Sequence, residues 1–461
     1  MSRSKARKEL DMLHGPIWSK LPRFALPVAA TAILEQLFNA SDLAVVGNFA
    51  VSDRTAAVAA VGANSAVIGL LVNLFVGIAL GANVVIATAI GRGDRKTVQQ
   101  AVHTSIVMAL GGGVLVALLG QLLAGPLLQA LHVPEDVYPL AVLYLRIYLL
   151  GMPVILLYNF EAAIFRSIGD TKTPLLVLAI SGGLNVIGNL FFVIVVKMTI
   201  DGVATATVLS NAVSSLLLFR KLRRADGAIQ VVPRQLRISW PVFGRILRIG
   251  LPAGIQSAMF SVSNIVIQSA INQLGTDVMA ASSAAFNIEI LAYYVLNAFS
   301  QACTTFVGQN YGAGQIKRCR RTLLLCILED AIATAAAIGL VLLSGRFLLS
   351  LFNREPAVIE LGYLRLRIVF SAYLFTMLYE TMSAYLRGFG RSLVPAILTV
   401  CGVCGVRIAW IYTAFPHDPT FRTILNVYPI SLAATAALVF IALLLYHPAR
   451  RFSASKPTPA G

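Results

Sequence analysis

Three polar residues interrupt a long apolar stretch near the amino terminus. Glu35, Asn39 and Asp42 stand at i, i+4 and i+7, which places them within about 40° of one another around an α-helix. A carboxyl group on such a polar stripe can take up a proton or another cation and release it again. The alternative is that the stripe joins helices through buried hydrogen bonds.

Charged residues recur within apolar stretches farther along the chain. Glu289, Glu380 and Arg407 each lie inside such a stretch. A buried acid either attracts a cation from outside the protein or forms an ion pair with a buried arginine. The sequence leaves both interpretations open for the two glutamates, with Arg407 as the expected partner in the second.

The elements that carry these residues must be membrane-spanning helices. Of 461 residues, 57% are hydrophobic and 12% are charged, against roughly 45–50% and about 25% in soluble domains. The apolar residues come in blocks of about twenty or more, long enough as helices to cross a hydrocarbon core about 30 Å thick. The first block is too long for a cleaved signal peptide and is expected to remain as the first helix.

Twelve such blocks predict an all-α integral membrane protein. They lie near 21–46, 57–89, 99–123, 138–165, 173–195, 201–219, 241–273, 277–309, 321–344, 357–386, 392–415 and 423–446. Most of the 37 lysine and arginine residues fall in the amino-terminal tail and in the breaks after every second block. Because basic loops remain in the cytoplasm, both termini are expected there. The net charge of +17 reflects these loops, and nucleic-acid binding is not expected.

The chain divides near its middle into two homologous halves. The segment LYNFEAAIFRSIGDTKTP at 157–174 matches LYETMSAYLRGFGRSLVP at 378–395, and the same constant offset aligns Gly93 with Gly314. Each half has an even number of helices, so the two six-helix bundles form a parallel repeat about an axis along the membrane normal. The predicted order is tail, bundle, linker, bundle and tail, at 1–20, 21–219, 220–240, 241–446 and 447–461.

The motifs, in this order, resemble those of the multidrug and toxic compound extrusion (MATE) family of secondary transporters. The resemblance rests on ILEQLFNASDLAVVGNF, AAVGANS, RSIGDTKTP and GQNYGAG. It implies export of amphipathic, often cationic, small molecules in exchange for protons or sodium ions. Asp42 aligns with the first-helix aspartate of the family and is the predicted ion-coupling residue.

The resemblance also suggests which side chains line the amino-terminal pocket. Asn159 and Asn185 match asparagines that line this pocket in family members. At Asn189 many relatives have a second aspartate, and Glu35, on the face of Asp42, is a candidate for the missing carboxylate. The predicted substrate-pocket residues of both halves are Gln36, Asn39, Asn159, Asn185, Asn189, Glu289, Glu380 and Arg407.

Other classes of function receive less support. A membrane-embedded enzyme would need a clustered acid, base or metal site, whereas the five histidines are dispersed. No phosphate-binding loop occurs, so an ion gradient is the expected energy source and no cofactor is expected. Within transport, the alternative is export or flipping of a lipid-linked or peptide-like metabolite. The expected partners are a small-molecule substrate and the bilayer of the cell (inner) membrane, and the chain is expected to act as a monomer.

Overall fold

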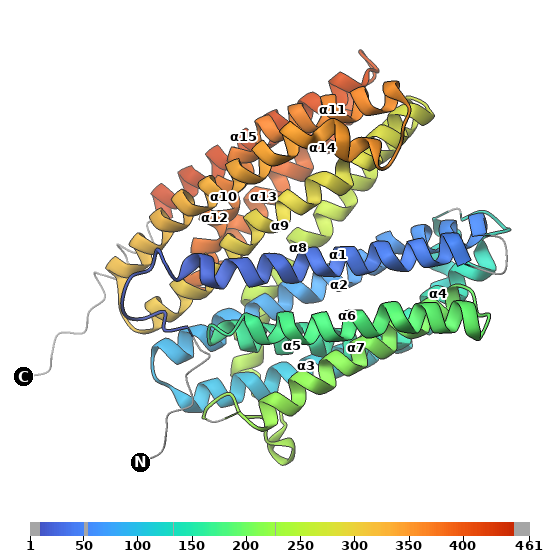
Figure 1. Cartoon of the computed structure of the whole chain (residues 1–461). Coiled ribbons are helices and arrows are strands. Elements are labelled where there is room, and N and C mark those ends of the chain that lie inside the picture. Colours follow the sequence, from blue (N-terminus) through green and yellow to red (C-terminus); the bar gives the residue numbers. More distant parts are fainter. Residues whose placement is uncertain (1–9, 50–53, 132, 226, 447–461) are drawn as a thin grey trace, which may run out of the picture. The chain divides into compact units, whose positions relative to one another are not determined.

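The computed structural model describes residues 10–49, 54–131, 133–225 and 227–446, which form a succession of helices (Figure 1). Helices are the expected solution, because a backbone inside lipid must satisfy its hydrogen bonds within its own segment. The first half contains α1 (Leu21–Phe49), α2 (Arg54–Gly91), α3 (Arg95–Ala130), α4 (Tyr138–Leu150), α5 (Met152–Ser167), α6 (Lys172–Leu190) and α7 (Ile200–Arg223). The second half contains α8 (Trp240–Asn272), α9 (Thr276–Gly312), α10 (Ile316–Ser350), α11 (Pro356–Ser371), α12 (Tyr373–Gly388), α13 (Leu393–Thr399), α14 (Val406–Thr413) and α15 (Phe421–Tyr446).

The helices fill the twelve predicted positions. Within the described residues, nine helices are long and apolar enough to cross a membrane, and the bent pair of α4 and α5 makes a tenth. Helix α1 and the consecutive helices α11 and α12 occupy the other two positions. These two segments carry several charged residues, among them Glu35 and Asp42 in α1 and Arg365 and Glu380 in α11 and α12. The predicted all-α membrane fold is confirmed.

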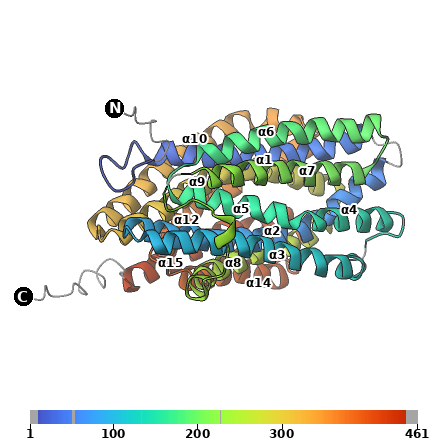
Figure 2. The same ribbon diagram turned by 90° about the horizontal axis from the view of Figure 1, so that it is seen from below.

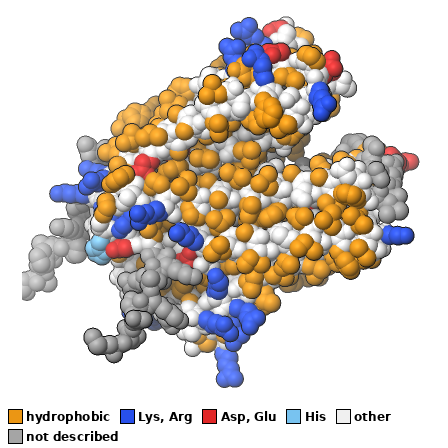
Figure 3. Space-filling view, viewed as in Figure 1, with side chains coloured by type: hydrophobic (Ala, Val, Ile, Leu, Met, Phe, Trp, Pro, Cys, Tyr) orange, Lys and Arg blue, Asp and Glu red, His pale blue; other side chains and the backbone are white. Residues whose placement is uncertain are grey.

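The sides of the helices are apolar. Large hydrophobic side chains stand out on α3 and α10, and Leu343 of α10 is 91% exposed. Figure 3 shows hydrophobic side chains along the helices and clusters of Lys and Arg toward their ends. This distribution fits helices that face lipid along their length and water at their ends.

The chain folds into two compact units. Unit 1 contains Ala30–Gly254, and unit 2 contains Asp11–Ala29 together with the chain from Ile255 onward. The boundaries therefore cut helices α1 and α8 and do not fall within the 220–240 linker. Each cut comes two residues after a proline inside the helix, Pro27 in α1 and Pro252 in α8. Because proline removes a backbone donor and kinks a helix, these are the positions where each helix can bend between the units.

The internal repeat extends to the contacts between helices. In unit 1, Nδ2 of Asn83 on α2 donates a hydrogen bond of 3.1 Å to the carbonyl oxygen of Ala163 on α5. In unit 2, Oγ1 of Thr304 on α9 donates one of 3.2 Å to the carbonyl oxygen of Ala384 on α12. Donor and acceptor are both displaced by the constant offset predicted from the sequence. The two units therefore share a packing plan as well as sequence motifs.

The turns and bends repeat in the same way. Gly93 and Gly314 end the turns after α2 and α9 with φ of 70° and 72°, a left-handed conformation that favours glycine. The segment predicted as one helix at 138–165 bends by 49° between α4 and α5, at Gly151. The corresponding segment of the second half breaks between α11 and α12 at Ala372, the repeat position of Gly151.

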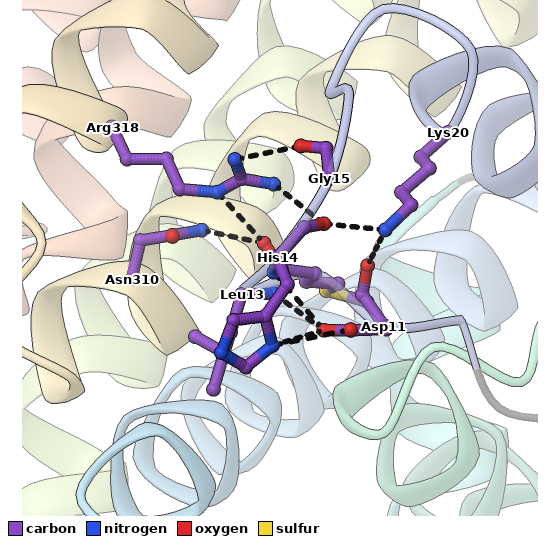
Figure 4. Close-up of polar contacts among 8 residues, drawn as sticks. Asp11, Leu13, His14, Gly15, Lys20, Asn310 and Arg318 are labelled. Atoms are coloured by element: carbon purple, nitrogen blue, oxygen red, sulfur yellow. Dashed lines mark hydrogen bonds and ion pairs between the residues drawn. The ribbon is translucent and has the colours of Figure 1, made fainter.

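The segment before α1 is anchored on unit 2 (Figure 4). Arg318 of α10 donates hydrogen bonds to the carbonyl oxygens of Met12 (3.2 Å), His14 (3.2 Å) and Gly15 (2.8 Å). Asn310 of α9 adds a hydrogen bond of 3.2 Å to the carbonyl oxygen of Met12, whose side chain is fully buried. These contacts hold the entry to α1 at the turn between α9 and α10.

Candidate functional site

The Asp42 carboxylate lies at the centre of a polar cluster in unit 1. Nδ2 of Asn189 donates a hydrogen bond of 2.6 Å to Oδ1 of Asp42, and Oγ1 of Thr207 donates one of 3.1 Å to Oδ2. Asn185 completes the cluster, with its Nδ2 3.2 Å from Thr207 Oγ1 and its Oδ1 3.3 Å from Asn189 Nδ2. The cluster thus joins α1, α6 and α7, and the last two lie side by side in Figures 1 and 2.

Close packing of α1 against α6 positions these groups. A Cβ atom at Gly182 of α6 would lie 1.7 Å from Cε2 of Phe38, so a larger residue here would displace the ring of α1 from its present position. Asp42 follows Phe38 by one helical turn, and Asn185 and Asn189 follow Gly182 by one and two turns. The contact between ring and glycine therefore brings the carboxylate of α1 to the polar face of α6.

The cluster holds a carboxylate without a cationic partner. Asp42 is 6% exposed, and its contacts among the described residues are the amide and hydroxyl groups of neutral side chains. An isolated charge is costly away from water, and an ionised carboxylate is stable here only while these donors face it. Oδ1 of Asn189 is buried beside the carboxylate and has no hydrogen-bond partner. Protonation of Asp42 would supply a donor next to this unpaired oxygen.

The remaining polar residues of α1 lie outside this cluster. Glu35 and Asn39 are exposed, and Gln36 is half-buried. Among the described residues, Arg166 of α5 interacts electrostatically with Glu35. The structure therefore does not bring Glu35 to Asn189 as a second carboxylate.

Asn159, a predicted pocket residue, lies outside the Asp42 cluster, whereas Thr207, which was not predicted, belongs to it. Asn159 is half-buried on α5, and its Nδ2 donates to the carbonyl oxygen of Ile155 in its own helix at 2.9 Å. It takes no part in the hydrogen bonds around Asp42. Thr207 was not singled out, although it stands at i and i+7 with Ser214 on a polar face of α7. This spacing of Thr207 and Ser214 is the signal that the sequence carries for the polar face of α7.

In unit 2, Glu289 forms a buried ion pair with Arg365. The Nε of Arg365 lies 2.8 Å from Oε1 of Glu289, and Nη2 lies 3.0 Å from Oε2. Ser282 accepts from Nη1 at 2.6 Å, and the carbonyl oxygen of Glu289 accepts from the hydroxyl of Tyr373 at 3.1 Å. The expected pairing of Glu289 with Arg407 is therefore wrong, because α11 presents its own arginine to α9.

Arg407 has a different environment. Its Nε donates a hydrogen bond of 3.2 Å to Oγ of Ser431, and its guanidinium lies 4.4 Å from the ring centroid of Tyr428. The side chain of Arg407 is 6% exposed, and no carboxylate contacts it among the described residues. The tyrosine face and the hydroxyl stabilise the cation without neutralising it.

Glu380 also pairs with an arginine other than Arg407. Nη2 of Arg387 lies 3.3 Å from Oε2 of Glu380, two turns earlier on α12. The repeat places Asn159 and Arg166 of α5 at the corresponding positions, so only the second unit has an acid and a base there. The pairing of Glu380 with Arg407 is wrong, because Arg387 on the same helix, α12, occupies the carboxylate.

Two further buried acids had not been singled out. Asp330 of α10 is fully buried and accepts hydrogen bonds from Thr334 (3.0 Å) and Thr381 (3.2 Å). Glu161 of α5 is also fully buried, and neither of its carboxyl oxygens has a hydrogen-bond partner. Both stand in the middle of apolar blocks, which was the signal available in the sequence.

Comparison with known proteins identifies the family. The family model MatE matches residues 27–191 and 252–413. The chain is 26% identical to the probable multidrug resistance protein YoeA of Bacillus subtilis, over 92% of this chain and 93% of that protein. It is 24% identical to an FAD transporter of Shewanella oneidensis, over 76% and 77% of the two chains.

A solved structure shows the same fold. The outward-facing conformation of a multidrug resistance MATE family transporter of the MOP superfamily superimposes with a TM-score of 0.88 at 22% identity, over 98% of this chain and 100% of that one. The resemblance found in the sequence motifs is therefore confirmed over both halves. The chain belongs to the MatE family and is a multi-pass membrane transporter for small molecules, not an enzyme.

Proposed function

We propose that the protein exports small amphipathic, cationic molecules across the cell (inner) membrane in exchange for protons or sodium ions. The observation that carries this proposal is the Asp42 carboxylate, buried in unit 1 and held, among the residues that the structure describes, by neutral donors alone. A monovalent cation is the ligand that neutralises such a group. Multidrug resistance proteins among the relatives supply the class of substrate.

The coupling follows from the charge of one residue. With no cation bound, Asp42 needs the hydrogen bonds of Asn189 and Thr207, which hold α1 to α6 and α7. A bound proton or sodium ion removes that need, so the three helices can repack. A switch of this kind requires only that the cation binds one arrangement more tightly than the other. Substrate release from the pocket then accompanies cation uptake from outside.

A second candidate substrate class is anionic. Arg407 is a buried cation with no carboxylate in contact among the described residues, and the relatives include an FAD transporter. A phosphate or carboxylate group of a substrate would neutralise Arg407 as a cation neutralises Asp42. If the substrate is anionic, the protein would export a metabolite and not a range of drugs.

Transport by the purified protein in proteoliposomes tests both candidates. Proton and sodium gradients are imposed separately, and the uphill movement of a cationic dye and of FAD is followed. We expect the dye to move under one of the two gradients and to stop when that gradient is collapsed. Movement of FAD alone would favour the anionic substrate class, and uphill dye movement without either gradient would contradict ion coupling.

A further inference from the structure

Unit 2 contains a second buried aspartate that is held by neutral donors alone. Asp330 of α10 is fully buried. Its Oδ1 accepts a hydrogen bond of 3.0 Å from Oγ1 of Thr334, one turn later on α10, and its Oδ2 accepts one of 3.2 Å from Oγ1 of Thr381 on α12. This chemistry is that of Asp42, in another unit and on different helices.

A third helix brings another oxygen to the same level. The face of α9 that carries Thr304 meets α12. Oγ1 of Thr304 donates to the carbonyl oxygen of Ala384, and Sγ of Cys303 lies 3.9 Å from the carbonyl oxygen of Thr381. Ser300 stands one turn before Thr304 on this face. Its hydroxyl is buried, its side chain is 2% exposed, and it has no hydrogen-bond partner.

The contact between two cysteines shows which residues of α9 and α10 lie at the same level as the site. Cys303 of α9 lies beside Cys326 of α10. Helices α9 and α10 are antiparallel neighbours joined by a short turn. Ser300 comes one turn before Cys303 on α9, and Asp330 comes one turn after Cys326 on α10. Because the two helices run in opposite directions, Ser300 and Asp330 lie at the same level. The hydroxyls of Thr334 and Thr381 bond to the Asp330 carboxylate, and Ser300 stands at the same level on α9.

The charged groups around Asp330 do not neutralise it. Glu380, next to Thr381 on α12, is a like charge close enough to act on Asp330. Arg387 is engaged by Glu380 at 3.3 Å, and the thiols of Cys326 and Cys303 lie beside the site. On α10 itself, both oxygens of Glu329 are buried without a hydrogen-bond partner. A carboxylate with a like charge nearby and no cation in contact is unfavourable inside a membrane protein unless a cation joins it.

The fold does not require an acid at this position. The constant offset of the repeat pairs Asp330 with Ala109 of α3 and Thr381 with Phe160 of α5. In unit 1 both counterparts are buried apolar side chains of the hydrophobic core. The same helix packing therefore forms with and without the carboxylate.

We propose that Asp330, with the hydroxyls of Ser300, Thr334 and Thr381, binds one monovalent cation, a proton or a sodium ion, within unit 2. Carboxylate and hydroxyl oxygens suit a sodium ion, and the carboxylate alone suits a proton. The part that this cation plays in transport rests on the proposed function, whereas its binding does not. Two such sites would let the two units each respond to a cation.

Cation binding by the purified full-length protein tests the site in two arms. The first measures equilibrium binding of radioactive sodium ions per protein. The second measures the infrared absorption of protonated carboxylic acids. We expect Asp330→Asn to lose one bound sodium ion or one protonated carboxyl group. The matched control Asp277→Asn, at an exposed position at the start of α9, should lose neither.

A second variant keeps the test decisive if Asp330→Asn does not fold. Thr381→Val preserves shape and charge and removes one oxygen, so a bound sodium ion should bind about fivefold more weakly. In the proton arm, the carboxylic acid band should shift in frequency, because its hydrogen bond to Thr381 is lost. Wild-type sodium affinity together with an unshifted band in Thr381→Val would overturn the proposal, as would unchanged results in a folded Asp330→Asn.

The same measurements separate this site from the proposed function. If Asp42→Asn retains gradient-driven export while Asp330→Asn loses its cation, the coupling role of Asp42 fails and the site in unit 2 stands. If Asp330→Asn binds cations as the wild type does and Asp42→Asn loses export, the site in unit 2 fails and the coupling role of Asp42 stands.

Discussion

The Nδ2 of Asn189 donates a hydrogen bond of 2.6 Å to Oδ1 of Asp42, so an amide stands beside the buried carboxylate of α1. An amide donates to a carboxylate but carries no charge of its own. The cluster in unit 1 therefore contains one carboxyl group, which a single monovalent cation would neutralise.

Replacing Asn189 with Ala removes the shortest of the hydrogen bonds to Asp42. Because the amide faces a buried charge, we expect a loss of about 1–3 kcal/mol in the free energy of unfolding, together with weaker gradient-driven export. Thermal unfolding of the purified protein and dye transport are the measurements. Asn48→Ala is the control, since Asn48 is exposed on α1 and donates to the carbonyl oxygen of Ala44 in its own helix. Equal effects of the two substitutions would show that the amide of Asn189 has no special role.

Gly182→Ala tests the contact that positions the cluster. An added methyl group would lie 1.7 Å from Cε2 of Phe38, so either the ring must turn aside or α1 must shift and weaken the contact of Asp42 with Asn189. We expect about 1–3 kcal/mol of destabilisation and a loss of export. The neighbouring substitution Gly183→Ala is the matched control, because a Cβ atom there meets nothing within 4 Å. Combining Gly182→Ala with Phe38→Ala should restore part of the stability, and a failure of this rescue would contradict the proposed packing.

The two ion pairs of α11 should differ in their contribution to stability. Glu289→Gln leaves the guanidinium of Arg365 buried and without its carboxylate, and we expect a cost of about 3–5 kcal/mol. The pair of Glu360 and Arg346 has both side chains 61% exposed, so Glu360→Gln should leave the melting temperature unchanged. A wild-type melting temperature for Glu289→Gln would contradict the assigned pair.

Asp11 should make the anchor of the amino-terminal segment sensitive to acid. Partial burial raises its pKa, but backbone N–H donors of Leu13 and His14 and the charge of Lys20 prevail and hold the pKa of Asp11 below its usual value of 3.8. A lowered pKa means that the folded anchor favours the ionised form. Its stabilisation is complete above pH 3.8 and is lost as the pH falls through the lowered pKa.

Hydrogen exchange of residues 11–20, compared between wild type and Asp11→Asn at each pH, measures this effect. We expect faster exchange in Asp11→Asn at neutral pH and a smaller difference in acid, where the wild-type carboxyl is protonated. A difference that grows toward acid would contradict the sign.

The sequence predicted the helices well because the bilayer imposes their length and composition. The block predicted at 277–309 appears as Thr276–Gly312, and the block at 173–195 appears as α6 and the short π-helix that follows it. The break at Ala372 was not predicted, since alanine is a good helix former and carries no local signal. Only the repeat of the Gly151 bend indicates it.

The site was predicted less completely, for a physical reason. Asp42 and Asn185 were found because they share residue types and spacing with a known family, and Asn189 because it stands where many members of that family have an aspartate. The partner of Glu289 depends on which face α11 turns toward α9, and spacing along one helix cannot give that rotation. For the same reason the sequence did not bring together Asp330 and Thr381, which lie on different helices.

The most direct test of the account is gradient-driven export by Asp42→Asn in proteoliposomes. The amide preserves the shape of Asp42 and removes the charge that we propose binds the cation. We predict wild-type abundance and membrane insertion, retained dye binding, and loss of uphill dye transport under either gradient, while Asp277→Asn transports normally. Full coupled transport by a well-expressed Asp42→Asn protein would contradict the assignment of Asp42 as the coupling residue.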